Sequence, residues 1–168
     1  MIPEVAFLKQ IYIFQDLNQQ ELEFVAQVIV PRGFAAGDVI VREGETGQSM
    51  YVIAEGEVEI SKTLTMKFGE DDFREADKTL DVMRAEDHVV FGEMSLVTDA
   101  ERSATIVAMT DCTLYEITKD NFMGLAAAKP ALGFKVTHRL AELVCMRLKK
   151  TSEDVIRLTT ALSIALSQ

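Results

Sequence analysis

A short segment in the middle of the chain carries the residues best suited to bind a small charged ligand. Glu93 and Arg102 lie nine residues apart, and Ser103 follows the arginine directly. A guanidinium group presents a planar fork of N–H donors that fits two oxygens of a phosphate, and a carboxylate accepts hydrogen bonds from sugar hydroxyls. Gly92 lets a ligand approach the backbone closely. The spacing indicates a site for a small sugar phosphate, although Glu and Arg so spaced are also typical of an ordinary surface ion pair.

The surrounding segment, residues 91–105, has the residue order of a known ligand-binding loop. It reads Phe91-Gly92-Glu93-Met94-Ser95-Leu96 and, after a short connection, Arg102-Ser103-Ala104-Thr105. This order resembles the phosphate-binding cassette of cyclic nucleotide-binding domains. Landmarks of the same family also match at residues 37–40, 43–45 and 51–58, and the entry to its first capped helix matches at residues 14–17. The resemblance covers residues 7–117.

This resemblance implies a β-roll that binds a cyclic nucleotide as a sensor, without catalysis of its own. It assigns the ligand contacts in the cassette to Phe91, Gly92, Glu93, Met94, Ser95, Arg102, Ser103 and Ala104. Arg102 and Ser103, with backbone amides near Gly92 and Ala104, are expected to neutralise the cyclic phosphate. Glu93 is expected to hold the 2′-hydroxyl, and Met94 to line the ribose. Neither a metal ion nor a further cofactor is implied.

A second resemblance concerns the C-terminal region. Residues 147–158 are similar to the dimer helix of the bacterial catabolite activator proteins, which implies that Thr151 and Ser152 contact the base, one from each subunit, and that Arg147 supports Glu93. Thr151 also falls in an apolar seam, where a polar group is costly without a partner. The alternative is that its hydroxyl pairs with its symmetry mate or with the carbonyl four residues earlier. Thr151 and Ser152, together with Ser103, favour cAMP as the ligand, and cGMP is the alternative.

Two helical regions flank a β-rich region, which predicts a mainly β fold with flanking α-helices. Short apolar runs separated by glycine turns indicate strands at residues 39–41, 50–53, 58–60, 80–83, 105–108 and 113–117. This pattern is typical of a compact β-roll, a jelly-roll-like double-stranded β-helix. We expect a single domain, residues 1–168, with N-terminal helices to residue 33, the β-roll over 34–117 and C-terminal helices over 118–168.

Three positions predict where helices begin. Asn18 with Glu21 forms a capping box before an apolar face at i, i+3, i+4 and i+7, and residues 31–33 stop that helix. Thr118 can cap a short helix, and Pro130 can open one long helix or two. Within the last stretch a heptad seam predicts a homodimer; it comprises Val144, Leu148, Thr151, Val155, Leu158, Leu162 and Ala165. The alternative is a helix folded back on its own domain, and a second face, at residues 136, 140 and 143, can pack on the roll.

The composition excludes several classes of protein. The 168 residues carry 17 Lys and Arg against 27 Asp and Glu, a net charge of −10, which disfavours direct binding to nucleic acids or to anionic membranes. No signal peptide and no apolar run of membrane-spanning length is present, and the two cysteines form no CxxC pair. We therefore expect a soluble, cytoplasmic protein. The acidic stretch at residues 69–77 predicts a solvated hairpin tip, with a cation or partner site as the alternative.

Three other functions compete with the sensor. The first is a nucleotide-free dimerisation module with a relic cassette. The second is a cupin-like metalloenzyme, which is disfavoured because the only histidines, His88 and His138, are fifty residues apart. The third is the regulatory part of a longer effector protein. The chain ends at Gln168 without the helix-turn-helix that follows the dimer helix in the activator proteins, so we expect no transfer of their DNA-binding function.

Overall fold

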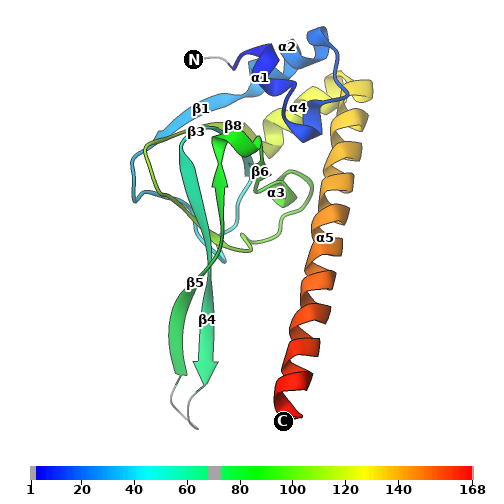
Figure 1. Ribbon diagram of the computed structural model, residues 1–168. Helices are drawn as coiled ribbons and strands as arrows, with labels where there is room; N and C mark the ends of the chain where they lie inside the picture. Colours follow the sequence, from blue (N-terminus) through cyan, green and yellow to red (C-terminus); the bar gives the residue numbers. More distant parts are fainter. Residues whose placement is uncertain (1–2, 68–72, 168) are drawn as a thin grey trace.

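Two four-stranded antiparallel sheets form the centre of the protein, with helices gathered at one end and a long helix at the side (Figure 1). The computed structural model describes residues 3–67 and 73–167. One sheet has the strand order β1-β8-β3-β6, and the other has the order β2-β7-β4-β5. The strands are β1 (Val30–Phe34), β2 (Val39–Val41), β3 (Ser49–Glu55), β4 (Glu57–Lys67), β5 (Phe73–Arg84), β6 (Val90–Phe91), β7 (Thr105–Ala108) and β8 (Cys112–Thr118). The predicted β-roll with flanking helices is confirmed.

The helices lie before, within and after the roll. They are α1 (Val5–Leu8), η1 (Tyr12–Phe14), α2 (Gln19–Val28), η2 (Ala85–Asp87), α3 (Met94–Val97), α4 (Lys119–Ala128) and α5 (Pro130–Leu166). Both predicted caps are present: the Asn18 side chain accepts from the Glu21 N–H in a reciprocal capping box, and the Thr118 side chain accepts from the Asn121 N–H. Pro130 opens α5, which is one continuous helix.

Strand β3 is covered on both faces, so it anchors two clusters of apolar side chains. Tyr51 and Ile53 point between the two sheets, toward buried groups such as Leu114. Met50 and Val52 point the other way, into a cluster built largely from the helices. The alternation follows from the two-residue period of a strand. The same rigid strand therefore fixes the roll interior and the helices relative to each other.

Two strands escaped prediction because their sequences lack the usual apolar runs. Residues 31–33 were expected only to stop the preceding helix, which does end at Val28, but they belong to β1 and pair with β8 at the sheet edge. Proline is tolerated there because an edge strand leaves one side unpaired. The first strand thus crosses the predicted boundary at residue 33. Strand β6 has only two residues, too few for a periodic signal.

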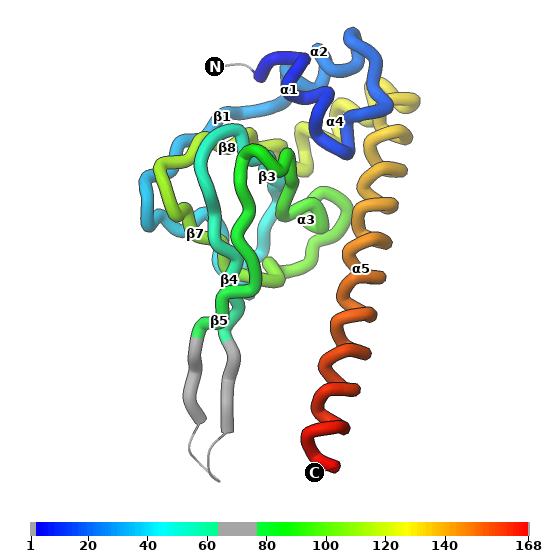
Figure 2. Tube along the Cα trace, viewed as in Figure 1, coloured from blue at the N-terminus to red at the C-terminus, as the bar shows by residue number. Residues whose placement is uncertain are grey.

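Strands β4 and β5 are longer than predicted and form a hairpin that projects beyond the roll (Figures 1 and 2). Residues 73–77 of the predicted acidic tip belong to β5, and residues 68–72 lie outside the described residues. Residues 85–87, where the family pattern has a Gly-Asp turn, form the 3₁₀ turn η2, which ends at His88 with φ of 50°.

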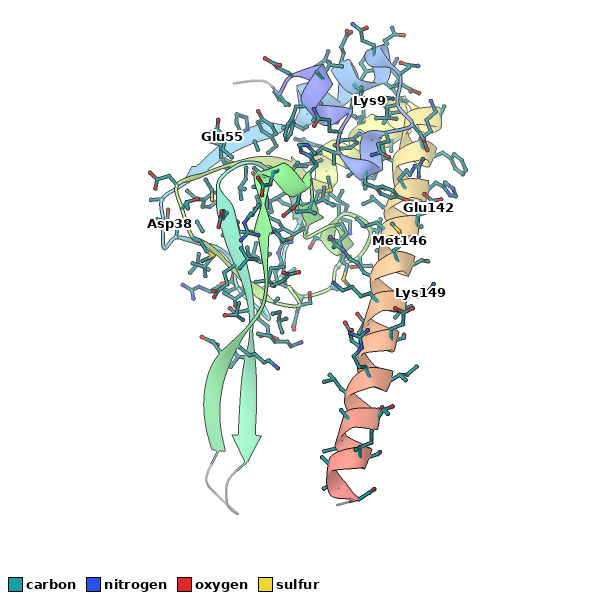
Figure 3. All side chains as sticks on the ribbon, viewed as in Figure 1. Lys9, Asp38, Glu55, Glu142, Met146 and Lys149 are labelled. Atoms are coloured by element: carbon teal, nitrogen blue, oxygen red, sulfur yellow. The ribbon has the colours of Figure 1, made fainter. Side chains whose placement is uncertain are left out.

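Helix α5 packs on its own chain over its first part only. Val136 and Leu140 are buried, and Leu143 is partly buried, in the cluster that includes Met50 and Val52. The face of α5 formed by residues 136, 140 and 143 therefore packs on the roll as predicted, in a cluster to which α4 and η1 also contribute. Past Lys149 the helix runs beyond the roll, and its side chains project on all sides (Figure 3). Among the described helices, none is long and apolar enough to cross a membrane.

Candidate functional site

The cassette connects β6 to β7 and lines a cavity of about 140 Å³. Every residue predicted to bind ligand lines this cavity except Thr151 and Ser152. Its wall consists of Val41, Ile60, Phe91, Gly92, Glu93, Met94, Ser95, Glu101, Arg102, Ser103, Ala104, Ile106 and Arg147. The predicted short helical turn is α3, which lies between Glu93 and Thr98. The fold thus brings the cassette residues together with one residue of α5.

Arg102 places a buried positive charge in the cavity, and its guanidinium is held by hydrogen bonds from one nitrogen, Nη1. The residue is 9% exposed, and its Nη1 donates to the Ser49 carbonyl at 2.8 Å and to Ser95 Oγ at 3.0 Å. Burial lowers the pKa of Arg102, because desolvation disfavours the charged form, yet a guanidinium remains protonated in proteins. Within the described residues, no carboxylate lies within 4.0 Å of this guanidinium. Glu116, Glu45 and Glu93 act on this charge only from beyond that distance. A buried charge without a directly paired counter-ion is expensive, which points to an anionic ligand.

The two remaining nitrogens of Arg102, Nε and Nη2, are available to such a ligand. Neither atom donates to a described protein group. Both are accessible to solvent, because among the described residues the one inaccessible side-chain N or O atom without a hydrogen-bond partner is His88 Nδ1. These atoms form the fork that matches two oxygens of a phosphate. The geometry of the site therefore leaves open the donors that phosphate recognition requires.

Two glycines make room for the guanidinium. A Cβ on Gly92 would lie 2.5 Å from Nη1, and the backbone there has φ of +71°, which favours glycine. A Cβ on Gly47 would overlap Nε and Cζ. Gly92 was identified from the sequence by its place in the cassette. Gly47 was missed, because it lies far from the cassette in the chain and belongs to a loop without another chemical signal.

Glu93 and Arg147 join the cassette to α5. The Glu93 side chain is 8% exposed, and its Oε1 lies 2.7 Å from Arg147 Nη1. Arg147 Nη2 also donates to the carbonyl of Val90 at 2.7 Å, so one guanidinium contacts both β6 and the cassette. Met146 and Lys149, labelled in Figure 3, flank this level of the helix. The contact between Arg147 and Glu93 that the resemblance implied is present.

Thr151 and Ser152 are exposed and stand outside the cavity. The Thr151 hydroxyl donates to the carbonyl of Arg147 at 3.0 Å, and the Ser152 hydroxyl donates to the carbonyl of Leu148 at 2.9 Å. This is the backbone pairing that the sequence left as the alternative for Thr151. Thr151 lies one turn beyond Arg147 on the same helix face. Their role as base contacts stays a prediction.

A buried polar group behind Arg102 was not anticipated. Glu116 of β8 accepts from Ser49 Oγ at 2.7 Å and from Arg32 Nε at 2.7 Å, and Tyr51 OH lies 3.3 Å away. Burial raises the pKa of Glu116, but the hydrogen bonds from Ser49 and Arg32 outweigh it and hold the pKa below its usual value. Ser49 thus links an ionised carboxylate to Arg102. The available signal was a glutamate inside an otherwise apolar strand.

A metal centre has no support in the part of the chain that the structure describes, where no group of three or more His, Cys, Asp or Glu could hold an ion. His88 packs edge-on against the ring of Phe7, with centroids 5.9 Å apart. His138 lies on α5, where its Nε2 is 3.6 Å from Glu142. The two histidines have separate partners, as expected of packing and surface residues.

Comparison with known proteins settles the family. The model of the cyclic nucleotide-binding domain matches residues 31–129, which is more than half of the chain. The chain belongs to the cyclic nucleotide-binding domain family. The match includes the cassette, the roll and α4, but not α5.

The relatives include regulatory proteins from bacteria and eukaryotes. The chain is 28% identical to the cyclic AMP receptor protein of Thermus thermophilus over 85% of its own length and 60% of that protein. It is also 28% identical to a cAMP-dependent protein kinase regulatory subunit of Hypocrea atroviridis, over 71% of the chain and 22% of the relative. The chain therefore spans only part of these relatives.

Solved structures agree. The catabolite activator protein of Thermus thermophilus aligns with a TM-score of 0.73 at 28% identity, covering 88% of this chain and 62% of that one. The regulatory domain of Toxoplasma gondii PKA aligns with a TM-score of 0.59 at 26% identity, covering 72% and 42%. The protein thus shares the family and the fold of the cyclic nucleotide-binding domains of these proteins.

Proposed function

We propose that this protein binds cAMP in the cassette cavity and acts as a cytoplasmic sensor without catalysis, metal or cofactor. The observation that carries the proposal is Arg102, a buried guanidinium with two nitrogens free and no carboxylate beside it among the described residues. An anion in the cavity would supply the missing counter-charge. A cyclic phosphate carries one negative charge on two free oxygens, which suits a planar fork of donors.

The remaining cavity residues fit the rest of the ligand. Glu93 is an acceptor held in place by Arg147, so it suits the 2′-hydroxyl. Met94 is half exposed at the rim, where it can cover the ribose. The cavity volume of about 140 Å³ is below the ~300–1,000 Å³ of pockets that enclose a whole ligand of this size. The base would therefore extend past Arg147 along α5, toward Thr151 and Ser152.

The choice of cAMP over cGMP rests on these two hydroxyls and on the relatives. The names of the Thermus thermophilus receptor and the Hypocrea atroviridis kinase subunit specify cAMP, whereas a cGMP-dependent protein kinase of Eimeria tenella is 31% identical over 71% of this chain. A hydroxyl from α5 can accept from the exocyclic amine of adenine. Direct titration with both nucleotides decides between them.

Signal transmission would pass through α5, with a second copy of the chain as partner. Arg147 is in contact with Glu93, so a ligand on Glu93 acts directly on the helix. Beyond that contact, seam residues such as Leu148 and Leu158 are exposed. Pairing of two α5 helices would bury the seam and bring Thr151 and Ser152 of two subunits to the bases. The effector that responds is a separate protein or a further region, and we propose no direct contact with nucleic acid.

Calorimetric titration tests the ligand assignment. We expect cAMP to bind at micromolar concentration or tighter, and Arg102→Ala to weaken binding by about 2–5 kcal/mol, or about 30-fold to a few thousand-fold. Arg42→Ala, at an exposed arginine outside the cavity wall, is the matched control and should leave the affinity unchanged. A change below about threefold in Arg102→Ala contradicts the phosphate assignment. The absence of heat with both nucleotides, in folded protein, supports the nucleotide-free dimerisation module.

A further inference from the structure

A second concave site lies on the face of the β1-β8-β3-β6 sheet that carries the helices, next to α1. It is a groove of about 400 Å³, larger than the cassette cavity, and the two have no lining residue in common. Phe7 and Tyr115 form an aromatic wall, with their rings edge to face and the centroids 5.6 Å apart. Glu4 and Glu55 also line it, and among the described residues no Lys, Arg or His does. We call this site the aromatic groove.

The negative charge of the aromatic groove is not neutralised by the described part of the chain. Glu55, labelled in Figure 3, ends β3, and one of its carboxylate oxygens accepts from the Thr113 hydroxyl at 3.0 Å. No described Lys or Arg lies within 4.0 Å of the carboxylate of Glu4 or Glu55. Burial raises the pKa of Tyr115, and the charges of Glu55 and Glu4 raise it further. Both carboxylates therefore lie close enough to act on the aromatic wall.

Another part of the molecule shows which side chain fits such a combination. The Arg139 guanidinium carbon lies 5.1 Å from the centre of the Tyr12 ring, and the same group donates to both carboxylate oxygens of Asp16 at 2.7 Å. A planar guanidinium can use an aromatic face and a carboxylate at the same time. At Tyr12 the chain supplies its own arginine. At the aromatic groove the described residues supply none.

We propose that the aromatic groove is a docking site for an arginine side chain of a partner protein. The guanidinium would lie against the aromatic wall and donate to the free carboxylate oxygens. Glu4, Pro31 and Glu55 are exposed, so the groove is open, whereas pockets for small molecules enclose most of their ligand. An open groove suits one side chain of a larger partner whose remaining surface covers the rim. This proposal is independent of cAMP binding in the cassette.

NMR titration of the nitrogen-15-labelled protein tests the groove directly. The probe is the tripeptide Gly-Arg-Gly with both ends blocked, and the control peptide carries citrulline, which has nearly the shape of arginine but no charge. We expect the arginine peptide to shift the amide signals of Thr113 and Tyr115 progressively, with saturation in the millimolar range. The citrulline peptide should leave them in place. Equal shifts with both peptides, or none with either, overturn the proposal.

A charge variant tests whether the peptide binds at this groove. Glu55→Gln keeps an acceptor for the Thr113 hydroxyl but removes the charge, so the arginine peptide should bind about fivefold more weakly, which corresponds to an exposed ion pair of about 1 kcal/mol. Glu23→Gln, at an exposed residue of α2 outside the groove, is the matched control and should bind as the unmodified protein does. An unchanged affinity in Glu55→Gln overturns the proposal.

A free organic cation is the other possible occupant of the groove. Tetramethylammonium is therefore titrated in parallel, since quaternary ammonium groups also bind to aromatic rings. We expect it to bind more weakly than the arginine peptide, because it donates no hydrogen bond to the carboxylates. Tighter binding of tetramethylammonium would assign the groove to a small cation and overturn docking of a protein side chain.

Discussion

The two halves of α5 share one backbone but have opposite surroundings. In the first half, Val136 and Leu140 are buried, and Arg139 makes hydrogen bonds of 2.7 Å with both carboxylate oxygens of Asp16. In the second half, Leu158 is 69% exposed and Leu166 is 78% exposed. Arg147, which contacts Glu93, lies at the boundary. The hydrogen bonds of a helix join residues four apart, so they form in buried and in exposed segments alike. A continuous helix therefore does not show which of its segments are stabilised by packing on the rest of the protein.

This contrast locates the candidate site at the junction between a packed and an unpacked segment. In proteins, most of the stability of a helix comes from tertiary packing of its apolar face rather than from the helix alone. The second half is therefore expected to gain stability from a partner, and a ligand that alters the contact at Arg147 can influence how it is held. The following predictions test the two halves against each other.

The largest effect is expected from a cavity in the anchored half. Leu140→Ala should lower the free energy of unfolding by about 2–5 kcal/mol, because the methyl groups removed are fully packed. Ile156→Ala, at an exposed apolar residue in the second half and outside the seam, should change it by less than about 0.5 kcal/mol. Urea denaturation measures both. Equal effects would mean that the second half is packed as well as the first.

The seam should matter for self-association instead. Leu158→Ala is expected to weaken the proposed dimer by about 1.5–3 kcal/mol per protomer, the free energy of burying one leucine side chain. Ile156→Ala is again the control and should leave the dimer constant nearly unchanged. Sedimentation equilibrium over a range of concentrations gives both constants. If the protein is monomeric at all concentrations, the seam has another partner.

The junction itself is tested through ligand affinity. Arg147→Ala leaves the buried Glu93 without its ion-pair partner, so cAMP binding should weaken by about 1.5–3 kcal/mol, or roughly 10- to 100-fold. Arg157→Ala, further along α5 at a residue whose side chain is 80% exposed, should have no effect. Calorimetry compares them. Similar affinities for the two variants would show that α5 does not support Glu93.

The smallest expected effect is the loss of folding stability at acid pH. Hydrogen bonds from Arg139 lower the pKa of Asp16. Burial raises the pKa of Glu21, but hydrogen bonds from Lys135 and Asn18 outweigh it, so the net direction is also down. Because these two pKa values are lowered, the folded state binds fewer protons than the unfolded state. The resulting stabilisation is present above the usual pKa values, 3.8 for Asp16 and 4.5 for Glu21, and is lost as pH falls through the lowered values.

Unfolding free energies should therefore be flat from about pH 7 to about pH 5 and then decline. Glu21→Gln should make the decline shallower, because it removes one of the carboxylates that must be protonated. Glu23→Gln, at an exposed residue two positions along α2, is the control and should leave the slope unchanged. A slope in Glu21→Gln identical to that of the unmodified protein contradicts this assignment.

Much of the fold could be predicted because the signals are local. Asn18 with Glu21 marks a helix start within four residues, and the cassette keeps Glu93 and Arg102 in one short segment. The edge strand β1 could not be predicted, since its pairing with β8 depends on residues about 80 positions away. The same holds for Ser49 and Glu116, which meet only because β3 and β8 are neighbours in the sheet.

The sequence by itself determined the capped helices, most strands, the cassette and the existence of two apolar faces on the last helix. Only the tertiary structure decided which of those faces belongs to this chain, because that depends on what the roll and the N-terminal helices present to it. It also decided that Gly47 makes room for the Arg102 guanidinium and that Ser95 accepts from it. Residue types and spacing identify which side chains can donate hydrogen bonds in a site. Which of their atoms are left free for a ligand depends on contacts between segments that are far apart in the chain.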